Sequence, residues 1–191
     1  MKKTLFAAVL VCVAAAGLAS AQAKPATAPK PAAQAAAPAN PLTAGTKATY
    51  DMVKGYITKA AEQVPEKLYA YKPTPEVRSF GQLIGHVADA NHMICGTAGT
   101  GKMPASDIEK TKTSKADLQK ALSESFAYCD KAFAAMTDAE GTRMVEMFGM
   151  KMPKLTALGF SVSHDFEHYG NIVTYMRLNK MVPPSSQGGG M

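Results

Sequence analysis

Histidine is scarce in this sequence, with four among 191 residues, and cysteine is scarcer still, with three. No apolar run of membrane-spanning length follows the first 23 residues, which argues against an integral membrane bundle. No strand-like alternation competes with helical spacing, and this argues against a mainly β fold. Basic residues are scattered rather than gathered on one stripe, which argues against nucleic-acid binding. These absences favour a helical domain, in which the few histidines are the first candidates for functional residues.

The N-terminus predicts export. Lys2 and Lys3 precede an apolar run, Leu5 to Leu18, and two overlapping small-residue cleavage sites follow within residues 19–23. The run is too short and too rich in alanine for a good membrane anchor. Cys12 lies within the run without a lipobox before it, which argues against a lipid anchor. We therefore expect residues 1–23 to be a cleaved signal peptide and the mature protein to be periplasmic or secreted.

Composition divides the remainder into three parts. Residues 24–41 contain only Ala, Pro, Lys, Thr, Gln and Asn, so we expect a disordered linker. Residues 42–182 fit one domain with one core, and the Gly/Ser-rich residues 183–191 are expected to be a disordered tail. The net charge of +6 falls to +4 when the two lysines of the signal peptide are removed. Solubility is a sufficient explanation for this moderate positive charge.

Two cysteines, Cys95 and Cys129, remain in the mature chain. An oxidising compartment slightly favours a disulfide between them, and the alternative is two separate buried thiols.

The spacing of apolar residues predicts four helices. Their expected ranges are about 43–64, 75–95, 114–136 and 153–180. In the second helix we expect Thr74 as the N-cap and Pro75 as the first residue, with the pattern breaking at Gly96. Residues 137–152 are expected to be a loop. Helices of this kind indicate an all-α, up-and-down four-helix bundle.

The third helix shows the bundle pattern most clearly. Ser114 and Asp117 form a capping box with Asp in place of Glu. The apolar residues then recur at intervals of three and four, as in a bundle seam: Leu118, Leu122, Phe126, Cys129, Phe133 and Met136.

Three of the four histidines are candidate metal ligands. His164 and His168 are four residues apart on the expected last helix, which places them about 40° apart around its axis and one turn apart along it. His86 lies beside the apolar stripe of the second helix, so its imidazole points into a seam. If these helices touch, the three imidazoles converge and leave a metal position open, as in catalytic zinc sites. His92 lies about 120° from His86 around the helix and is excluded.

Two other motifs have simpler explanations. His164 to His168 matches the H-x-x-E-H motif of inverted zincins, but no acidic residue follows His168 to supply the third ligand. Glu167 is therefore interpreted as a flank residue of the helix. Four methionines between residues 144 and 152 could suit Cu(I), but Val145 and Phe148 interleave with them, which favours packing.

Two stretches carry a family resemblance. The sequences YKPTPEVRSFGQLIGHVADANHMIC and HDFEHYGNIVTYMRLNKMVPPSS resemble the DinB-like (DinB/YfiT-type) metalloprotein family over residues 42–186. The resemblance implies a four-helix bundle with a metal held between helices by His86, His164 and His168. It also implies zinc, nickel or another divalent ion, and relatives that include thiol transferases and isomerases. Residues 168–171 read His-Tyr-Gly-Asn where the family commonly has His-Arg-Gly-Gln.

Two classes of function follow. The first is a metal-dependent hydrolase or thiol transferase acting on an unidentified small molecule, in which the metal lowers the pKa of a bound water or thiol. The second is a non-catalytic periplasmic protein that binds metal or a small molecule, as a monomer or a homodimer. Neither class involves nucleic acid or stable membrane insertion after cleavage of the signal.

We predict that the mature protein lacks the first 21 or 23 residues, because the basic, apolar and small-residue segments follow the order that signal peptidase requires. Intact-mass measurement of protein isolated from its native host tests this. A mature species that still carries Met1 to Ala19 contradicts it.

Overall fold

The computed structural model describes residues 39–188. The predicted signal peptide, residues 24–38 of the predicted linker and the last three residues lie outside the described residues. The described chain contains the long helices α1 (Pro41–Gln63), α2 (Phe80–Thr100), α4 (Lys115–Ala134) and α6 (Lys154–Leu178). It also contains the short helices η1 (Glu66–Leu68), α3 (Ile108–Thr111), α5 (Asp138–Gly141) and η2 (Pro184–Ser186), and the strands β1 (Met144–Met147) and β2 (Met150–Pro153).

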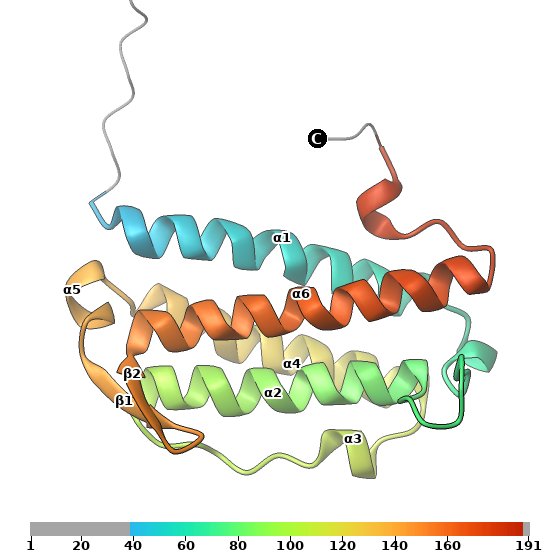
Figure 1. The fold of residues 1–191 in the computed structure, drawn as a ribbon, viewed down its shortest axis with the longest axis horizontal. Helices are drawn as coiled ribbons and strands as arrows, with labels where there is room; N and C mark the ends of the chain where they lie inside the picture. The colour runs from blue at the N-terminus through green and yellow to red at the C-terminus, as the bar shows by residue number, and fades with distance from the viewer. Residues whose placement is uncertain (1–38, 189–191) are drawn as a thin grey trace, which may run out of the picture. The chain divides into compact units, whose positions relative to one another are not determined.

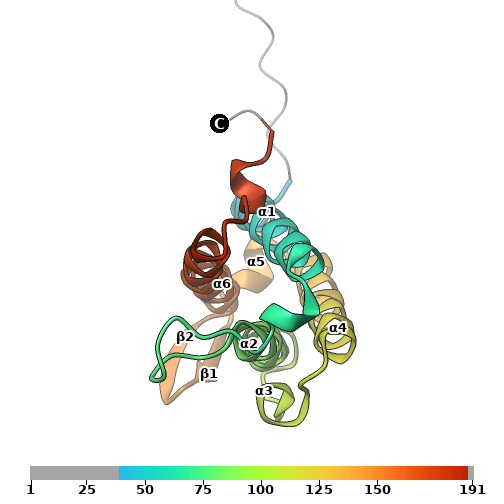
Figure 2. The ribbon, with the colours of Figure 1, turned by 90° about the vertical axis from the view of Figure 1, so that its right-hand side faces the viewer.

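The four long helices form a bundle, as predicted (Figure 1). Viewed end-on, each helix lies beside two others: α1 packs on α4 and α6, and α2 packs on the same two helices from the other side (Figure 2). Because every long helix has two neighbours, each can bury a broad apolar stripe in the shared core.

The helix directions differ from the expected strict alternation. Along α2 and α4 the contacts advance together, from Gly85 beside Leu118 to the bond between Cys95 and Cys129, so these helices run parallel. The connection 101–114 makes this geometry feasible, because about 14 extended residues reach roughly 45 Å and α2 is only about 30 Å long. The connection runs back along α2 and carries α3 (Figure 1).

The core contains a buried polar layer between α2 and α6. Asn91 and Ser161 are both 0% exposed, and the Ser161 hydroxyl donates to the Asn91 side-chain oxygen over 2.9 Å. Asp165 is equally buried, and burial raises its pKa well above the usual range, although the Asn91 side chain opposes the shift. A neutral carboxyl group at this position avoids the large cost of burying an unpaired charge.

Three of the four predicted helices are confirmed to within a few residues. Ser114 caps α4, because its hydroxyl oxygen accepts a hydrogen bond from the Asp117 backbone N–H over 3.1 Å. The other half of the predicted capping box is absent, since the Asp117 carboxylate accepts from the Ser114 hydroxyl over 2.8 Å instead of from its backbone N–H. The seam residues predicted for this helix are all buried. The last helix begins directly after Pro153 and ends at Leu178, close to its expected end.

The predicted start of α2 was wrong. The helix begins at Phe80, and its N-cap is Ser79 rather than Thr74. Ser79 and Gln82 form a reciprocal capping box, in which each side chain bonds the other residue's backbone N–H, over 3.2 and 2.9 Å. Two backbone donors are satisfied in this way, whereas a start at Pro75 offers no such pair.

The predicted end of α2 at Cys95 was also wrong. The helix continues through Gly96 and ends at Gly101, whose φ of 76° is left-handed. Gly96 is required for packing rather than for a break: a Cβ atom there would lie 2.5 Å from the Pro104 ring. Close approach of the returning connection, and not flexibility, explains this glycine.

The expected loop 137–152 contains a β-hairpin. β1 and β2 are antiparallel, with Met147 opposite Met150, so Phe148 and Gly149 form a two-residue turn. Val145 and Met147 are buried while Met144 and Met150 are exposed. The alternation covers only four residues, which is why it gave no convincing signal in the sequence.

The tail expected to be disordered from residue 183 is ordered as far as residue 188. Pro184 is buried, and η2 packs against α1. The Tyr169 hydroxyl anchors this segment: it donates to the Ser185 hydroxyl and accepts from the Ser185 N–H, each over 2.9 Å.

Cys95 and Cys129 form a disulfide, with Cα atoms 5.1 Å apart, which confirms the favoured alternative. The bond ties α2 to α4 inside the core, where both residues are 0% exposed. No helix within residues 39–188 is both long and apolar enough to cross a membrane.

Replacing both cysteines with Ala should lower the free energy of unfolding by roughly 2–4 kcal/mol, because the bond closes a loop between residues 34 apart. Urea unfolding of the oxidised protein and of the double variant measures the difference. Thiol labelling of oxidised protein after denaturation is the direct control, and two labelled cysteines contradict the pairing.

Candidate metal centre

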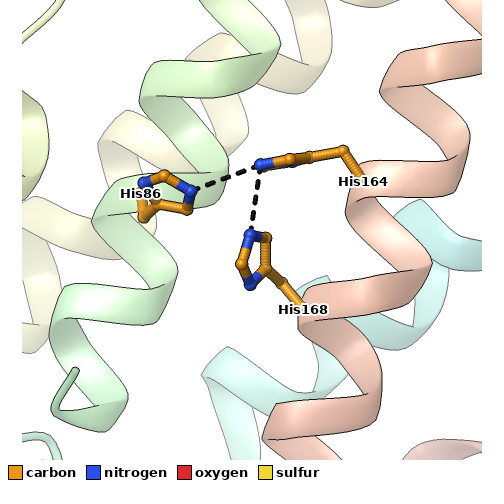
Figure 3. Close-up of side chains that lie close together, drawn as sticks. All are labelled: His86, His164 and His168. Carbon is orange, nitrogen blue, oxygen red and sulfur yellow. Dashed lines mark hydrogen bonds between the residues drawn. The ribbon is translucent and has the colours of Figure 1, made fainter. Parts of the chain in front are cut away.

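Two imidazoles project from the same face of α6. His164 and His168 lie one turn apart on this helix, and their Nε2 atoms are 3.1 Å apart (Figure 3). Their spacing of four residues produces this geometry, because side chains at such positions stack on one helical face. His168 is buried and His164 is partly buried.

The third imidazole comes from α2. The Nε2 atom of His86 lies 3.2 Å from that of His164, although 78 residues separate the two histidines. The three imidazoles offer nitrogens that all lie within 4.8 Å of one another (Figure 3). The predicted convergence of His86, His164 and His168 is therefore confirmed.

The chemistry of these nitrogens fits a cation. The His164 Nε2 faces the Nε2 atoms of both other rings, and a neutral imidazole nitrogen either donates or accepts one hydrogen bond. One proton cannot satisfy three converging nitrogens, whereas a divalent ion can. Tetrahedral zinc with bonds of 2.0–2.1 Å places ligand nitrogens about 3.3 Å apart, close to the separations here.

Glu109 of α3 orients the His86 ring. Its carboxylate Oε2 lies 3.1 Å from the His86 Nδ1, and its Oε1 accepts a hydrogen bond from the Arg78 Nε over 2.9 Å. A proton on Nδ1 donates to Glu109 and leaves the Nε2 lone pair facing the other imidazoles. Such carboxylate–histidine pairs fix the tautomer and increase the basicity of a metal ligand.

Two residues of α2 hold Glu109 in place. Gly85 allows α3 to approach, because a Cβ atom at this position would lie 2.7 Å from the Cα of Glu109. Asp89 caps α3: its carboxylate accepts from the backbone N–H groups of Ile108 and Glu109, over 2.7 and 2.9 Å, and from the Ser106 hydroxyl. The orientation of His86 therefore depends on the returning connection as well as on the bundle.

Burial keeps the two imidazoles of α6 neutral. Desolvation, reinforced by the imidazoles of His168 and His86, lowers the pKa of His164 to about 3. Desolvation and the His86 imidazole likewise lower the pKa of His168 to about 4. Both rings therefore present lone pairs at neutral pH, which is the form that binds a metal.

Two cavities are lined by residues of the histidine cluster. One, of about 350 Å³, contains His86 and His164 in its lining and is otherwise mostly apolar. The other, of about 650 Å³, is lined by His168 together with polar residues that include Arg78, Glu109 and Asn171. Each of the three imidazoles therefore lines one of the two cavities.

The remaining sequence candidates lie where they were expected. His92 packs against Tyr128, with ring centroids 5.3 Å apart, and is not one of the three clustered histidines. Glu167 is exposed at the rim of the polar cavity, as expected of a flank residue. Asn171 extends the ligand face, with its amide 3.5 Å from the His168 Nδ1.

Sequence reasoning missed Glu109, Arg78 and Asp89. Glu109 belongs to a helix of four residues, too short to produce a periodic pattern. Arg78 precedes the true N-cap of α2, which had been placed five residues too early. The capping box Ser79-Phe-Gly-Gln82 was visible in the sequence, and it would have placed Arg78 beside the start of the histidine helix.

Comparison with known proteins agrees with this architecture. The model of the DinB superfamily matches residues 49–172, which is most of the chain. The chain belongs to the DinB superfamily. The match includes all three histidines of the cluster, so the family resemblance inferred from the sequence is confirmed. No curated protein matches the chain significantly.

Solved DinB-like structures share this fold. A DinB-like protein from Bacillus cereus is 18% identical, with a TM-score of 0.65 over 74% of this chain and 95% of its own. Another from Bacillus subtilis is 21% identical, with a TM-score of 0.60 over 72% and 93%. The mycothiol-dependent maleylpyruvate isomerase is 15% identical, with a TM-score of 0.56 over 68% of this chain and 60% of the isomerase.

The lowered pKa values predict how stability depends on pH in the absence of metal. Below about pH 6.5 the histidines of the unfolded chain take up protons, whereas His168 and His164 stay neutral in the folded protein down to about pH 4 and 3. The buried neutral carboxyl group of Asp165 opposes this effect, because it ionises when the chain unfolds, and it offsets about one of the two protons. The free energy of unfolding should therefore fall as the pH decreases from about 6 to 4. Urea unfolding in EDTA at several pH values measures this slope.

The variant His164→Ala should show a shallower slope over this range, because one neutral buried imidazole is removed. His92→Ala is the matched control and should keep the wild-type slope. Equal slopes for the wild-type protein and His164→Ala contradict the assignment of a neutral, buried His164.

Proposed function

We propose that this DinB-superfamily protein is exported, binds one divalent metal ion, zinc or nickel, through His86, His164 and His168, and acts on a small molecule at that metal. The observation that carries the proposal is the convergence of three imidazole nitrogens, and each of these imidazoles lines a cavity. Three protein ligands leave at least one coordination position for water or substrate, as in catalytic sites.

The surrounding residues prepare the ligands rather than perform chemistry of their own. Glu109 favours the His86 tautomer with the proton on Nδ1, and burial keeps the His164 and His168 rings neutral. A bound divalent ion would lower the pKa of a water or thiol at its open position. Imidazole ligands suit zinc and nickel, which supports the choice of metals.

Of the two reactions considered, thiol transfer is better supported than hydrolysis. Two separate cavities, each lined by at least one of the three histidines, offer room for two molecules, a thiol and its acceptor. A similarly folded structure is that of a mycothiol-dependent isomerase, whose name also implies a thiol partner. We therefore propose a low-molecular-weight thiol and a small electrophile as partners, with neither nucleic acid nor membrane involved.

One observation favours the alternative of a non-catalytic metal-binding or small-molecule-binding protein, monomeric or homodimeric. Two of the carboxylates that line the cavities are already engaged: Glu109 by His86 and Arg78, and Asp89 by Ser106 and the α3 backbone. Neither of these two groups is free to serve as a general base, which favours binding without catalysis.

Untagged protein should bind one zinc or nickel ion per chain, and His164→Ala should bind none while its helix content is mostly retained, because Ala suits a helix. Elemental analysis after dialysis, with circular dichroism on the same samples, measures both. His92→Ala is the control and should keep its metal. A His164→Ala variant that still holds one ion per chain contradicts the proposed site.

Turnover measurements distinguish the metal-dependent enzyme from the non-catalytic binding protein. Metal-loaded protein is assayed for conjugation of glutathione with 1-chloro-2,4-dinitrobenzene and for hydrolysis of 4-nitrophenyl acetate. Turnover that His164→Ala lacks and His92→Ala retains supports the enzyme. Stoichiometric metal with no turnover above the His164→Ala background in either assay favours the binding protein.

A further inference from the structure

Phe148 occupies a backbone position that bulky residues seldom adopt. It and Gly149 form the two-residue hairpin turn, and both have positive φ, 53° and 75°. Asn, Asp or Gly is the usual first residue of such a turn, because an aromatic residue is strained there. Phe148 gains little core packing in return, since its side chain remains 50% exposed.

The Phe148 ring instead lines the apolar cavity beside the imidazoles. The hairpin packs against both α2 and α6 (Figure 2), and Phe148 is the hairpin residue that lines this cavity. The Phe148 ring centroid lies 6.1 Å from that of Phe160 on α6, and the Phe160 centroid lies 6.5 Å from that of His164. A row of aromatic rings therefore leads from the hairpin turn to the candidate metal ligands.

The rest of the cavity is also suited to an apolar group. Ala90, Met93 and Ile94 of α2 contribute to its lining. Its one carboxylate, that of Asp89, already accepts hydrogen bonds from Ser106, Ile108 and Glu109. A volume of about 350 Å³ lies at the lower end of the range for small-molecule sites.

We propose that this cavity is an aryl-binding subsite, in which Phe148 and Phe160 select a small ligand that carries a flat apolar group next to its metal-binding atom. The inference rests on the proposed metal site and adds the class of ligand. The strain at Phe148 is retained because its ring forms the outer wall of the subsite. Phe148 and Phe160 are thus specificity-determining residues, outside the set of metal ligands.

A pair of hydroxamates tests the subsite. Benzohydroxamate and acetohydroxamate chelate a metal through the same atoms and differ in phenyl against methyl. Isothermal titration of zinc-loaded wild-type protein should show benzohydroxamate binding at least about tenfold more tightly, because the phenyl group is removed from water. Equal dissociation constants overturn the proposal.

Two substitutions test which residues cause the preference for benzohydroxamate over acetohydroxamate. Phe148→Asn and Phe160→Ala should each reduce it severalfold and leave the affinity for acetohydroxamate unchanged. Phe148→Asn should also raise the melting temperature, because Asn suits the turn, so weaker phenyl binding cannot be attributed to a damaged fold. Met144→Ala, an exposed position on the same hairpin, is the control and should retain the preference. A preference that survives both phenylalanine substitutions overturns the proposal.

A metal-free arm separates failure of the subsite from failure of the metal site. The chain has no tryptophan, so Phe148→Trp introduces a single tryptophan into the lining of the cavity, and its emission can be excited selectively at about 295 nm, where tyrosine absorbs little. In EDTA, toluene should shift its emission, whereas Met144→Trp should not respond. A response in protein that binds no metal keeps the aryl subsite and removes the proposed function. The absence of any response in Phe148→Trp overturns the subsite.

Discussion

The register between α2 and α6 is the constraint on which the candidate site depends. His86 comes from one helix and the other two histidines from its antiparallel neighbour, and the Nε2 atoms of His86 and His164 lie 3.2 Å apart. A slip of one helical turn would move His164 and His168 by about 5.4 Å relative to His86 and would separate the ligands. The buried hydrogen bond between Ser161 and Asn91 fixes this register, because a slip would leave both polar groups unpaired inside the core.

The sequence predicted the parts of the site that depend on helical periodicity. The spacing of His164 and His168 determines their shared face, and the apolar stripe beside His86 determines that it points inward. Both inferences use only the geometry of one helix, which survives packing nearly unchanged. The four long helices were predictable for the same reason, since their stripes recur over many turns.

What could not be predicted depends on short or returning segments. Glu109 reaches His86 only because Gly85 lets a four-residue helix approach, a contact with no periodic signature. The parallel arrangement of α2 and α4 follows from the path of the connection 101–114, which the spacing of apolar residues does not encode. Phe148 was interpreted only as a packing residue, because an aromatic residue seldom occupies the first position of a left-handed turn.

The placement of the cross-link has a consequence for how the bundle opens. The disulfide joins α2 to α4, and the three imidazoles would join α2 to α6 through a shared ion. Neither link includes α1, which is held by side-chain packing and by hydrogen bonds such as that from the Tyr50 hydroxyl to the Phe126 carbonyl. Among the long helices of the described bundle, α1 is therefore the one that can detach while the other three stay joined. Hydrogen exchange should be fastest along α1, and the ligand-bearing helices should be the last to separate.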